Sequence, residues 1–130
     1  MGRIITPITV ANALDPSNEL RCDALVDTGT AGLVLPNAWK GRLGVLPGTR
    51  VVELELANQQ VVPGEICGPV RIQIEGFDPI YSEVTFMDMH PENGRYEPLI
   101  GYIILGQSRA AVDMVGHRLV LVKHVDLKAA

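Results

Sequence analysis

The sequence predicts an all-β protein, a small closed β-barrel with one short helix near the C-terminus. Three observations lead there. Short runs of β-branched and apolar residues alternate with polar ones, and clusters of Gly, Pro, Asn and Asp separate them at the spacing of a small barrel of about eight strands. The 130 residues are 47% hydrophobic, which suits one domain covering residues 1–130.

The chain opens with a predicted β-hairpin. Residues 3–14, "RIITPITVANAL", are rich in β-branched residues, and the extended pattern resumes over residues 19–27. Between them, "DPSN" at residues 15–18 supplies turn residues. The second strand of this hairpin therefore ends at Asp27.

The middle of the chain carries the strongest β pattern. After an apolar run at residues 32–36, residues 37–44 contain at most one helical turn. Residues 51–68 alternate on both sides of "ANQQ", which predicts a hairpin with its tip near Asn58, and residues 70–75 predict a further strand.

The C-terminal third mixes strand and helix signals. Residues 81–89 are extended in pattern, and residues 90–98 form a polar loop. Residues 99–100 favour strand, whereas residues 102–110 favour a short helix weakened by a glycine. The apolar run at residues 118–127 predicts a closing strand.

Charge and cysteine content narrow the possible partners. The net charge is −4 with 20% charged residues and no basic stripe, so neither nucleic acid nor an anionic membrane is an expected partner. Neither a signal-peptide pattern nor a membrane-spanning run is present, which predicts a soluble cytoplasmic protein. Cys22 and Cys67 lie far apart without a CxxC pair, so we expect free thiols and no metal site.

One motif in the sequence contains residues that could act in catalysis. Asp27, Thr28 and Gly29 form an Asp-Thr-Gly triplet at the end of an apolar strand. Three residues alone do not define a site, because an Asp at a strand end also serves as an ordinary turn residue. The context decides between the two interpretations.

That context resembles the retropepsin-like aspartic proteases. "ALVDTGTAGLVLP" is similar to the active-site segment of the family, and "LIGYIILGQSRAAVD" is similar to its second hallmark, two apolar residues and a Gly before a short helix. Between them, residues 51–68 occupy the place of the family's flap hairpin. The resemblance covers nearly the whole chain and implies a retropepsin-type (acid protease) barrel that works as a homodimer.

The resemblance also implies roles for single residues. Asp27, Thr28 and Gly29 are the expected catalytic triplet, with the Thr28 hydroxyl bonded across the dimer. Leu99 and Gly101 are expected to pack behind the Asp27 loop. The expected substrate contacts are the flap tip and two residues beside the triplet: Ala57, Asn58, Gln59, Gln60, Thr30 and Ile100.

A single triplet implies that one chain supplies only half of the active site. The chemistry requires two carboxyl groups about one water, so the second Asp27 has to come from a second copy of the chain. We therefore expect a homodimeric aspartic endopeptidase acting on a peptide or protein substrate without a cofactor. The apolar segments at residues 3–10 and 118–125 are expected to pair across the dimer interface.

Two other functions stay open on the sequence. Thr30 is bulkier than the Ala or Ser usual in the family, and "ANQQ" lacks the glycines of retroviral flaps. A retropepsin-like module that dimerises or binds peptides with negligible catalysis is therefore an alternative. The third is a structural β-barrel whose triplet is coincidental.

Overall fold

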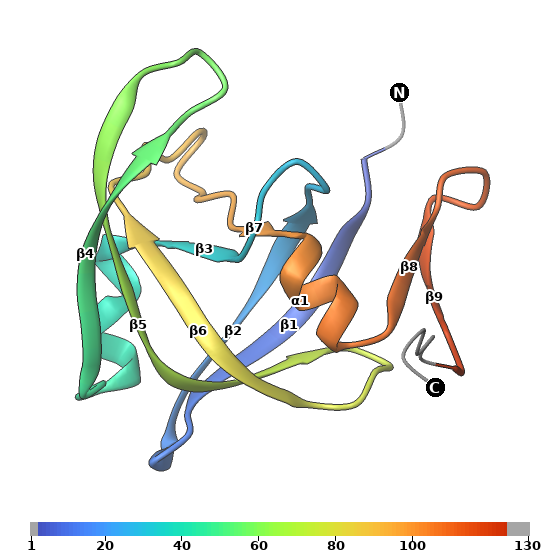
Figure 1. The fold of residues 1–130 in the computed structure, drawn as a ribbon, viewed down its shortest axis with the longest axis horizontal. Helices are drawn as coiled ribbons and strands as arrows, with labels where there is room; N and C mark the ends of the chain where they lie inside the picture. Colours follow the sequence, from blue (N-terminus) through green and yellow to red (C-terminus); the bar gives the residue numbers. More distant parts are fainter. Residues whose placement is uncertain (1–2, 125–130) are drawn as a thin grey trace, which may run out of the picture.

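A seven-stranded mixed sheet rolled into a nearly closed ring forms the body of the molecule (Figure 1). The computed structural model describes residues 3–124. Six strands form the ring, and β1 closes it by pairing with β5. In order around the ring they are β1 (Ile5–Asn12), β2 (Asp15–Val26), β7 (Leu99–Ile100), β3 (Leu33–Pro36), β6 (Ile80–Met87) and β5 (Val61–Ile74). The predicted all-β barrel is confirmed.

The remaining strand of this sheet, β4 (Gly48–Glu55), pairs only with the first half of β5. The second half of β5 pairs with β1, from Ile74 opposite Ile8 to Val70 opposite Asn12. The β4–β5 hairpin therefore extends beyond the ring, and it is the predicted flap hairpin.

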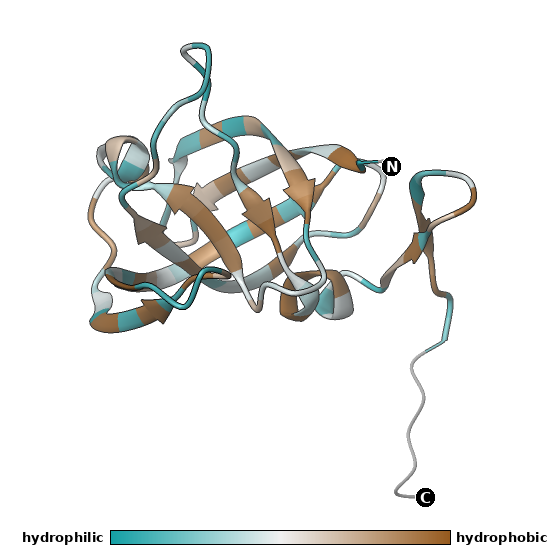
Figure 2. Ribbon diagram, turned by 90° about the horizontal axis from the view of Figure 1, so that it is seen from above, coloured by the Kyte–Doolittle hydropathy of each residue, from teal (hydrophilic) through white to brown (hydrophobic). Residues whose placement is uncertain are grey.

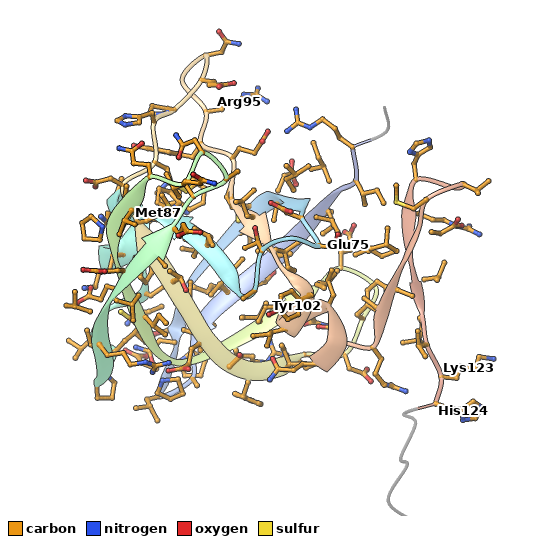
Figure 3. The ribbon with its side chains drawn as sticks, turned by 45° about the horizontal axis from the view of Figure 1, so that its top comes forward. Glu75, Met87, Arg95, Tyr102, Lys123 and His124 are labelled. Atoms are coloured by element: carbon orange, nitrogen blue, oxygen red, sulfur yellow. The ribbon has the colours of Figure 1, made fainter. Side chains whose placement is uncertain are left out.

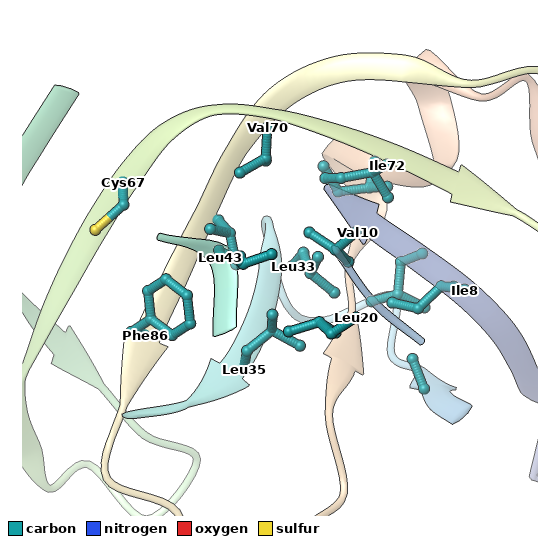
Figure 4. Close-up of a cluster of buried hydrophobic side chains, with 14 of the residues drawn as sticks. Ile8, Val10, Leu20, Leu33, Leu35, Leu43, Cys67, Val70, Ile72 and Phe86 are labelled. Carbon is teal, nitrogen blue, oxygen red and sulfur yellow. The ribbon is translucent and has the colours of Figure 1, made fainter. Parts of the chain in front are cut away.

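The core lies inside the ring and follows from the alternation along the strands (Figure 2). Ile72 of β5 and Phe86 of β6 are each 0% exposed, whereas their neighbours along each strand are half-buried. In β1, Ile8 and Val10 are buried on either side of the half-buried Thr9. Figure 4 shows Leu33 and Leu35 among these side chains. Burial of this set is the main favourable term in folding.

The first hairpin turns earlier than predicted. Its turn lies at Ala13–Leu14, and "DPSN" belongs to β2 instead. The buried side chain of Asn12 explains the difference, because its Oδ1 accepts the backbone N–H groups of Leu14 and Asp15 at 2.9 and 3.2 Å.

The second strand of the predicted hairpin and the strand predicted over residues 70–75 form one long strand, β5. The register against β6 shifts between Cys67 and Val70, at the Gly68–Pro69 step. Proline lacks a backbone N–H, so an irregularity at this place is expected. The strand continues past it and links the flap hairpin to the ring.

Two short helices flank the ring. The 3₁₀-helix η1 (Asn37–Leu43) is longer than the single turn predicted, and α1 (Tyr102–Gln107) is shorter than the predicted helix. Within residues 3–124, neither helix has the length and apolar character needed to cross a bilayer.

The C-terminal prediction requires correction. Strand β8 (Ala110–Asp113) follows α1 directly, and it pairs antiparallel with β9 (Arg118–Leu121) in a separate two-stranded sheet. We call these two strands the arm. They project beside the ring in both Figure 1 and Figure 2, so the predicted closing strand does not close the barrel; β1 does.

Candidate active site

Asp27 lies directly after β2, at the point where the chain leaves the sheet. Its backbone N–H donates to the carbonyl of Ile100 at 2.9 Å, and its carbonyl accepts the N–H of Thr30 at 3.1 Å. The residue is half-buried. The strand end therefore fixes the backbone of Asp27 while its side chain keeps access to solvent.

The Asp27 carboxylate receives a donor on each oxygen. The backbone N–H of Gly29 donates to Oδ1 at 3.0 Å, and the hydroxyl of Thr30 donates to Oδ2 at 2.8 Å. Hydrogen bonds to an ionised carboxylate are about twice as strong as neutral ones. Both bonds restrict the rotation of the carboxylate, so it is oriented before any substrate arrives.

Thr30 therefore has a role that the sequence did not reveal. It was expected to contact substrate, yet its hydroxyl is bonded to Asp27. The sequence offered one hint, since a residue three positions after an Asp in a turn is close enough for its side chain to reach the carboxylate. Thr30 orients the carboxylate in this structure.

The turn after Asp27 is held from behind by the chain around Gly101. Three successive backbone N–H groups, of Gly101, Tyr102 and Ile103, donate to the carbonyls of Gly32, Thr30 and Ala31, each at 2.9 Å. A Cβ on Gly101 would lie 2.1 Å from the Thr30 carbonyl oxygen, so only glycine fits there.

The two residues before Gly101 form β7 between two strands of the site. Leu99 and Ile100 pair in parallel with Leu25 and Val26 of β2, and antiparallel with β3. Ile100 is 0% exposed and packs in the core, so its side chain supports the site from behind instead of meeting substrate as expected. Leu99 is the half-buried member of the pair.

Thr28 is exposed beside Asp27. Within residues 3–124 its hydroxyl forms no hydrogen bond, in contrast to that of Thr30. Gly29 is also exposed, and its N–H is the one directed at the carboxylate. The two residues therefore face outward from a single subunit.

The flap tip is a tight, hydrogen-bonded turn. The N–H of Leu56 donates to the Gln60 carbonyl at 2.8 Å, and Asn58 Oδ1 accepts the N–H of Gln60 at 2.9 Å. Gln59 has φ of +67°, a value that glycine adopts most easily. The predicted tip residues Ala57, Asn58, Gln59 and Gln60 are all exposed, and no hydrogen bond within the described residues joins them to the Asp27 turn.

A groove of about 1390 Å³ begins between the flap hairpin and β2. Gln60 of the flap and Leu25 of β2, two residues before Asp27, both line it. Its other walls include Trp39 and Tyr96, which the sequence did not connect with the site.

The Cys22 thiol lies along the same groove. Burial, with a smaller contribution from the negative charge of Asp23, raises the pKa of this thiol to about 11. Both cysteines are free. Because the thiolate is the reactive form, Cys22 is a poor nucleophile at neutral pH.

Residues 3–124 contain no group of three or more His, Cys, Asp or Glu side chains placed to hold an ion. Asp88, near His90 in the sequence, accepts a hydrogen bond from Asn37 at 2.9 Å.

Comparison with known proteins identifies the fold. No family model and no curated protein matches the sequence. A solved structure that resembles it is an EIAV protease in complex with the inhibitor HBY-793, at 21% identity and a TM-score of 0.59, over 80% of this chain and 86% of that one. The chain therefore has the retropepsin-like fold expected from its motifs.

Proposed function

We propose that the chain is one subunit of a homodimeric aspartic endopeptidase, in which two Asp27 carboxyl groups activate one water. The observation that carries this proposal is the carboxylate itself. It stands half-buried at a strand end of a retropepsin-like fold, with the Gly29 N–H on one oxygen and the Thr30 hydroxyl on the other.

The chemistry follows from pairing two such groups. At a separation of about 3 Å, as in the aspartic-protease pattern, two carboxyl groups do not both ionise and share one proton. The ionised member takes a proton from the water as it attacks the peptide carbonyl, and the protonated member donates to the developing oxyanion. The two titration steps belong to the pair and not to either Asp27.

The second carboxyl group has to come from a second copy, because the chain contains one Asp-Thr-Gly triplet. A twofold axis beside Asp27 brings the two triplets together. The exposed Thr28, whose hydroxyl is unbonded within residues 3–124, is placed to bond the other subunit there. In this proposal Thr28 contributes to the dimer interface, whereas Thr30 orients the Asp27 carboxylate of its own chain.

The arm is the second part of the proposed interface. Each of its strands has a single partner within residues 3–124, which leaves two strand edges open. Met114 at its tip and Leu121 near its end are 67% and 48% exposed. Open apolar edges favour association, so we propose that the arms of two copies pair.

Only the first residues of the N-terminal segment are left for the same role. Residues 3–10 were expected to pair across the interface, but from Ile8 onward β1 pairs on both sides within the chain, with β2 and with β5, whereas Ile5 and Thr6 pair with β2 alone. Val125, the last residue of the other expected segment, lies outside the described residues. The proposed interface therefore keeps residues 118–121 of that segment, which form β9 of the arm, and adds β8.

One substitution tests the enzymatic claim. Wild type and Asp27→Asn are incubated with a diverse peptide library from about pH 3 to pH 8, and new termini are read by mass spectrometry. We expect cleavage by wild type and none by Asp27→Asn, which keeps the shape of the side chain. Asp15→Asn, at an exposed position outside the triplet and the groove, is the matched control and should cleave normally. Equal cleavage by wild type and Asp27→Asn would overturn the proposal.

A mixed dimer tests the shared site. Wild-type and Asp27→Asn chains with different tags are refolded together, and the heterodimer is purified through both tags. It should be as inactive as the Asp27→Asn homodimer, because each water needs both carboxyl groups. A heterodimer with half of the wild-type activity would show that each chain has a complete site.

Peptide binding without hydrolysis is the second candidate, and the flap favours it. The flap tip has no glycine, and hydrogen bonds through Asn58 and Gln60 hold it in one turn. A flap that closes slowly limits turnover while leaving binding intact. In the library experiment this function gives peptide capture with no new termini.

A further inference from the structure

The loop between β6 and β7 reverses direction through a two-residue turn. The N–H of Glu92 donates to the Arg95 carbonyl at 2.8 Å, and the N–H of Arg95 donates to the Glu92 carbonyl at 2.9 Å. Between them, Asn93 and Gly94 have φ of +53° and +75°. Asn followed by Gly is the pair that such a turn favours, because both residues adopt positive φ at low cost. The turn therefore explains why these two residues stand together.

The turn is exposed and weakly held. Residues 90–95 are all exposed, and Glu92 and Arg95 form an isolated bridge outside the strands. Figure 3 shows Arg95 on the loop, where it projects beyond the ring of strands. Exposed backbone hydrogen bonds with few buried contacts open at low cost. The turn can therefore rearrange while the ring stays folded.

The side chain of Asn93 differs from those of the other asparagines. Each of the other four takes part in at least one hydrogen bond: Asn12, Asn18, Asn37 and Asn58. Within residues 3–124 the Asn93 side chain takes part in none, and the N–H of Gly94 has no acceptor. Asn93 is also the only asparagine followed by glycine. The side-chain carbonyl carbon of Asn93 and the nitrogen of Gly94 are thus both left available for reaction with each other.

We propose that Asn93 is a site of spontaneous deamidation, with water as the only reactant from outside the chain. The nitrogen of Gly94 attacks Cγ of Asn93 and forms a bond to it, and the bond from Cγ to Nδ2 breaks. Ammonia leaves with the proton of the Gly94 N–H, and a cyclic imide remains. Water then opens the imide at either of its carbonyls, which gives aspartate or isoaspartate. The reacting atoms lie in adjacent residues, so the ring closes by rotation within the turn alone.

Both products alter the wall of the groove beside the flap. Asn93 and Gly94 line it next to Glu92, so either product adds a negative charge beside an existing one. Isoaspartate also carries the main chain through Cβ and lengthens it. The two hydrogen bonds between Glu92 and Arg95 require a fixed span, so the isoaspartate form loses them, whereas the aspartate form keeps them. The chain thereby acquires a second, chemically distinct form of this loop.

The main experiment follows every asparagine in the folded, full-length chain. Wild type and Asp27→Asn are incubated at mildly alkaline pH, digested and analysed by mass spectrometry, which detects replacement of the amide by an acid. Electron-transfer fragmentation separates isoaspartate from aspartate. We expect Asn93 to convert at least about tenfold faster than any other asparagine, and Asn93→Gln to remove this conversion. Conversion of Asn93 no faster than that of Asn58 would overturn the proposal.

Gln59→Gly is the matched control for the effect of the dipeptide alone. Gln59 has φ of +67°, so glycine fits there, and the change places a glycine after Asn58. The Asn58 side chain remains bonded, because its Oδ1 accepts the N–H of Gln60 at 2.9 Å. In this variant Asn58 should convert at least about threefold more slowly than Asn93. Equal rates would overturn the role of the unbonded side chain in selecting Asn93.

A second measurement tests the effect on the turn. The NMR signals of the Glu92 and Arg95 amides are recorded for incubated protein enriched in isoaspartate and for Asn93→Asp, which adds the charge without lengthening the backbone. Large shifts are expected only in the isoaspartate form, and their absence there would overturn the loss of the turn. Conversion should be equal in wild type and Asp27→Asn, so failure of the proposed peptidase activity leaves this inference intact.

Discussion

The hydroxyl of Thr30 donates to Oδ2 of Asp27 at 2.8 Å, so the side chain three residues on orients the carboxylate. The Gly29 N–H holds the other oxygen. One of the two donors thus depends on side-chain identity and the other does not. Thr30 is the position at which the orientation of the carboxylate can be altered without changing the triplet.

Thr30→Val should lower kcat at least about tenfold, because it keeps the shape of the side chain and removes a donor to a charged group. Thr30→Ser keeps the donor and should retain most of the activity. The measurement is steady-state cleavage of one peptide, with thermal unfolding as the check on folding. If Thr30→Val and Thr30→Ser are equally active, the hydroxyl does not orient Asp27.

Gly101→Ala should destabilise the fold by at least about 3 kcal/mol, because its Cβ would lie 2.1 Å from the Thr30 carbonyl oxygen and 2.6 Å from that of Ala31. Urea unfolding followed by circular dichroism measures the change. Gly106→Ala is the control: its Cβ would have no atom within 4 Å, and it should stabilise α1 by about 0.5–1 kcal/mol. Similar stabilities of the two variants would contradict the steric argument.

Arg109→Ala should weaken the dimer by about fivefold to tenfold in Kd, because Arg109 fixes the base of the arm. Its guanidinium donates to the Lys123 carbonyl at 3.1 Å and to Asp78 at 3.2 Å. Asp78→Ala, which loses only an exposed ion pair, should have a smaller effect. Sedimentation equilibrium gives both constants. Unchanged dimerisation in Arg109→Ala would argue against the arm as the interface.

The turn of the arm adds a local electrostatic effect. The N–H of Gly116 donates to Asp113 at 2.9 Å and, with smaller contributions from Arg118 and Val115, holds the pKa of this carboxyl below its ordinary 3.8. A lowered carboxyl pKa stabilises the fold above the ordinary value, and the effect is lost as the pH falls through the lowered pKa. The turn is therefore retained through most of the acid range of the library experiment.

Stability should fall as the pH rises from about 9 to about 11, because of Cys22. The pKa of its thiol is raised from 9.0 to about 11 by burial, so in this range the unfolded chain releases the proton while the folded chain keeps it. Urea unfolding at pH 8, 9 and 10 measures the loss. Cys22→Ala should remove most of this pH dependence. The same dependence in Cys22→Ala would assign it to another group.

Local patterns were sufficient for much of the fold. The alternation around "ANQQ" predicted the flap hairpin, and its turn lies at residues 56–60 as expected. The strand that ends before Asp27 was likewise readable, because apolar residues and a Gly-containing turn mark its end. An element that consists of one strand and its adjoining turn can therefore be predicted from the sequence alone.

Strand β8 of the arm was missed for a physical reason, whereas β9 lies within the strand predicted over residues 118–127. Arg109 ends the helix with φ of +56°, a conformation usually marked in the sequence by Gly or Asn. Alanines at positions 110 and 111 favour helix in isolation, and only pairing with β9 makes them a strand. Tertiary contacts overrode the local preference.

The site was predictable in part. The triplet and Gly101 are visible as motifs, whereas the bond from Thr30 depends on a side-chain rotamer that a sequence does not specify. The groove between the flap hairpin and β2 depends on Trp39 meeting Tyr96 across a long separation in the chain. Such contacts exist only once the ring of strands has formed.

The three N–H groups of Gly101, Tyr102 and Ile103 that hold the Asp27 turn belong to the backbone. Every residue except proline keeps its N–H at position 102 or 103, so other substitutions there leave these backbone bonds to the Asp27 turn in place. The turn can thus be inherited while the residues around it diverge. This is one way in which a chain only 21% identical to the EIAV protease keeps the same fold, and it directs a search for distant relatives toward the glycine and the triplet instead of overall identity.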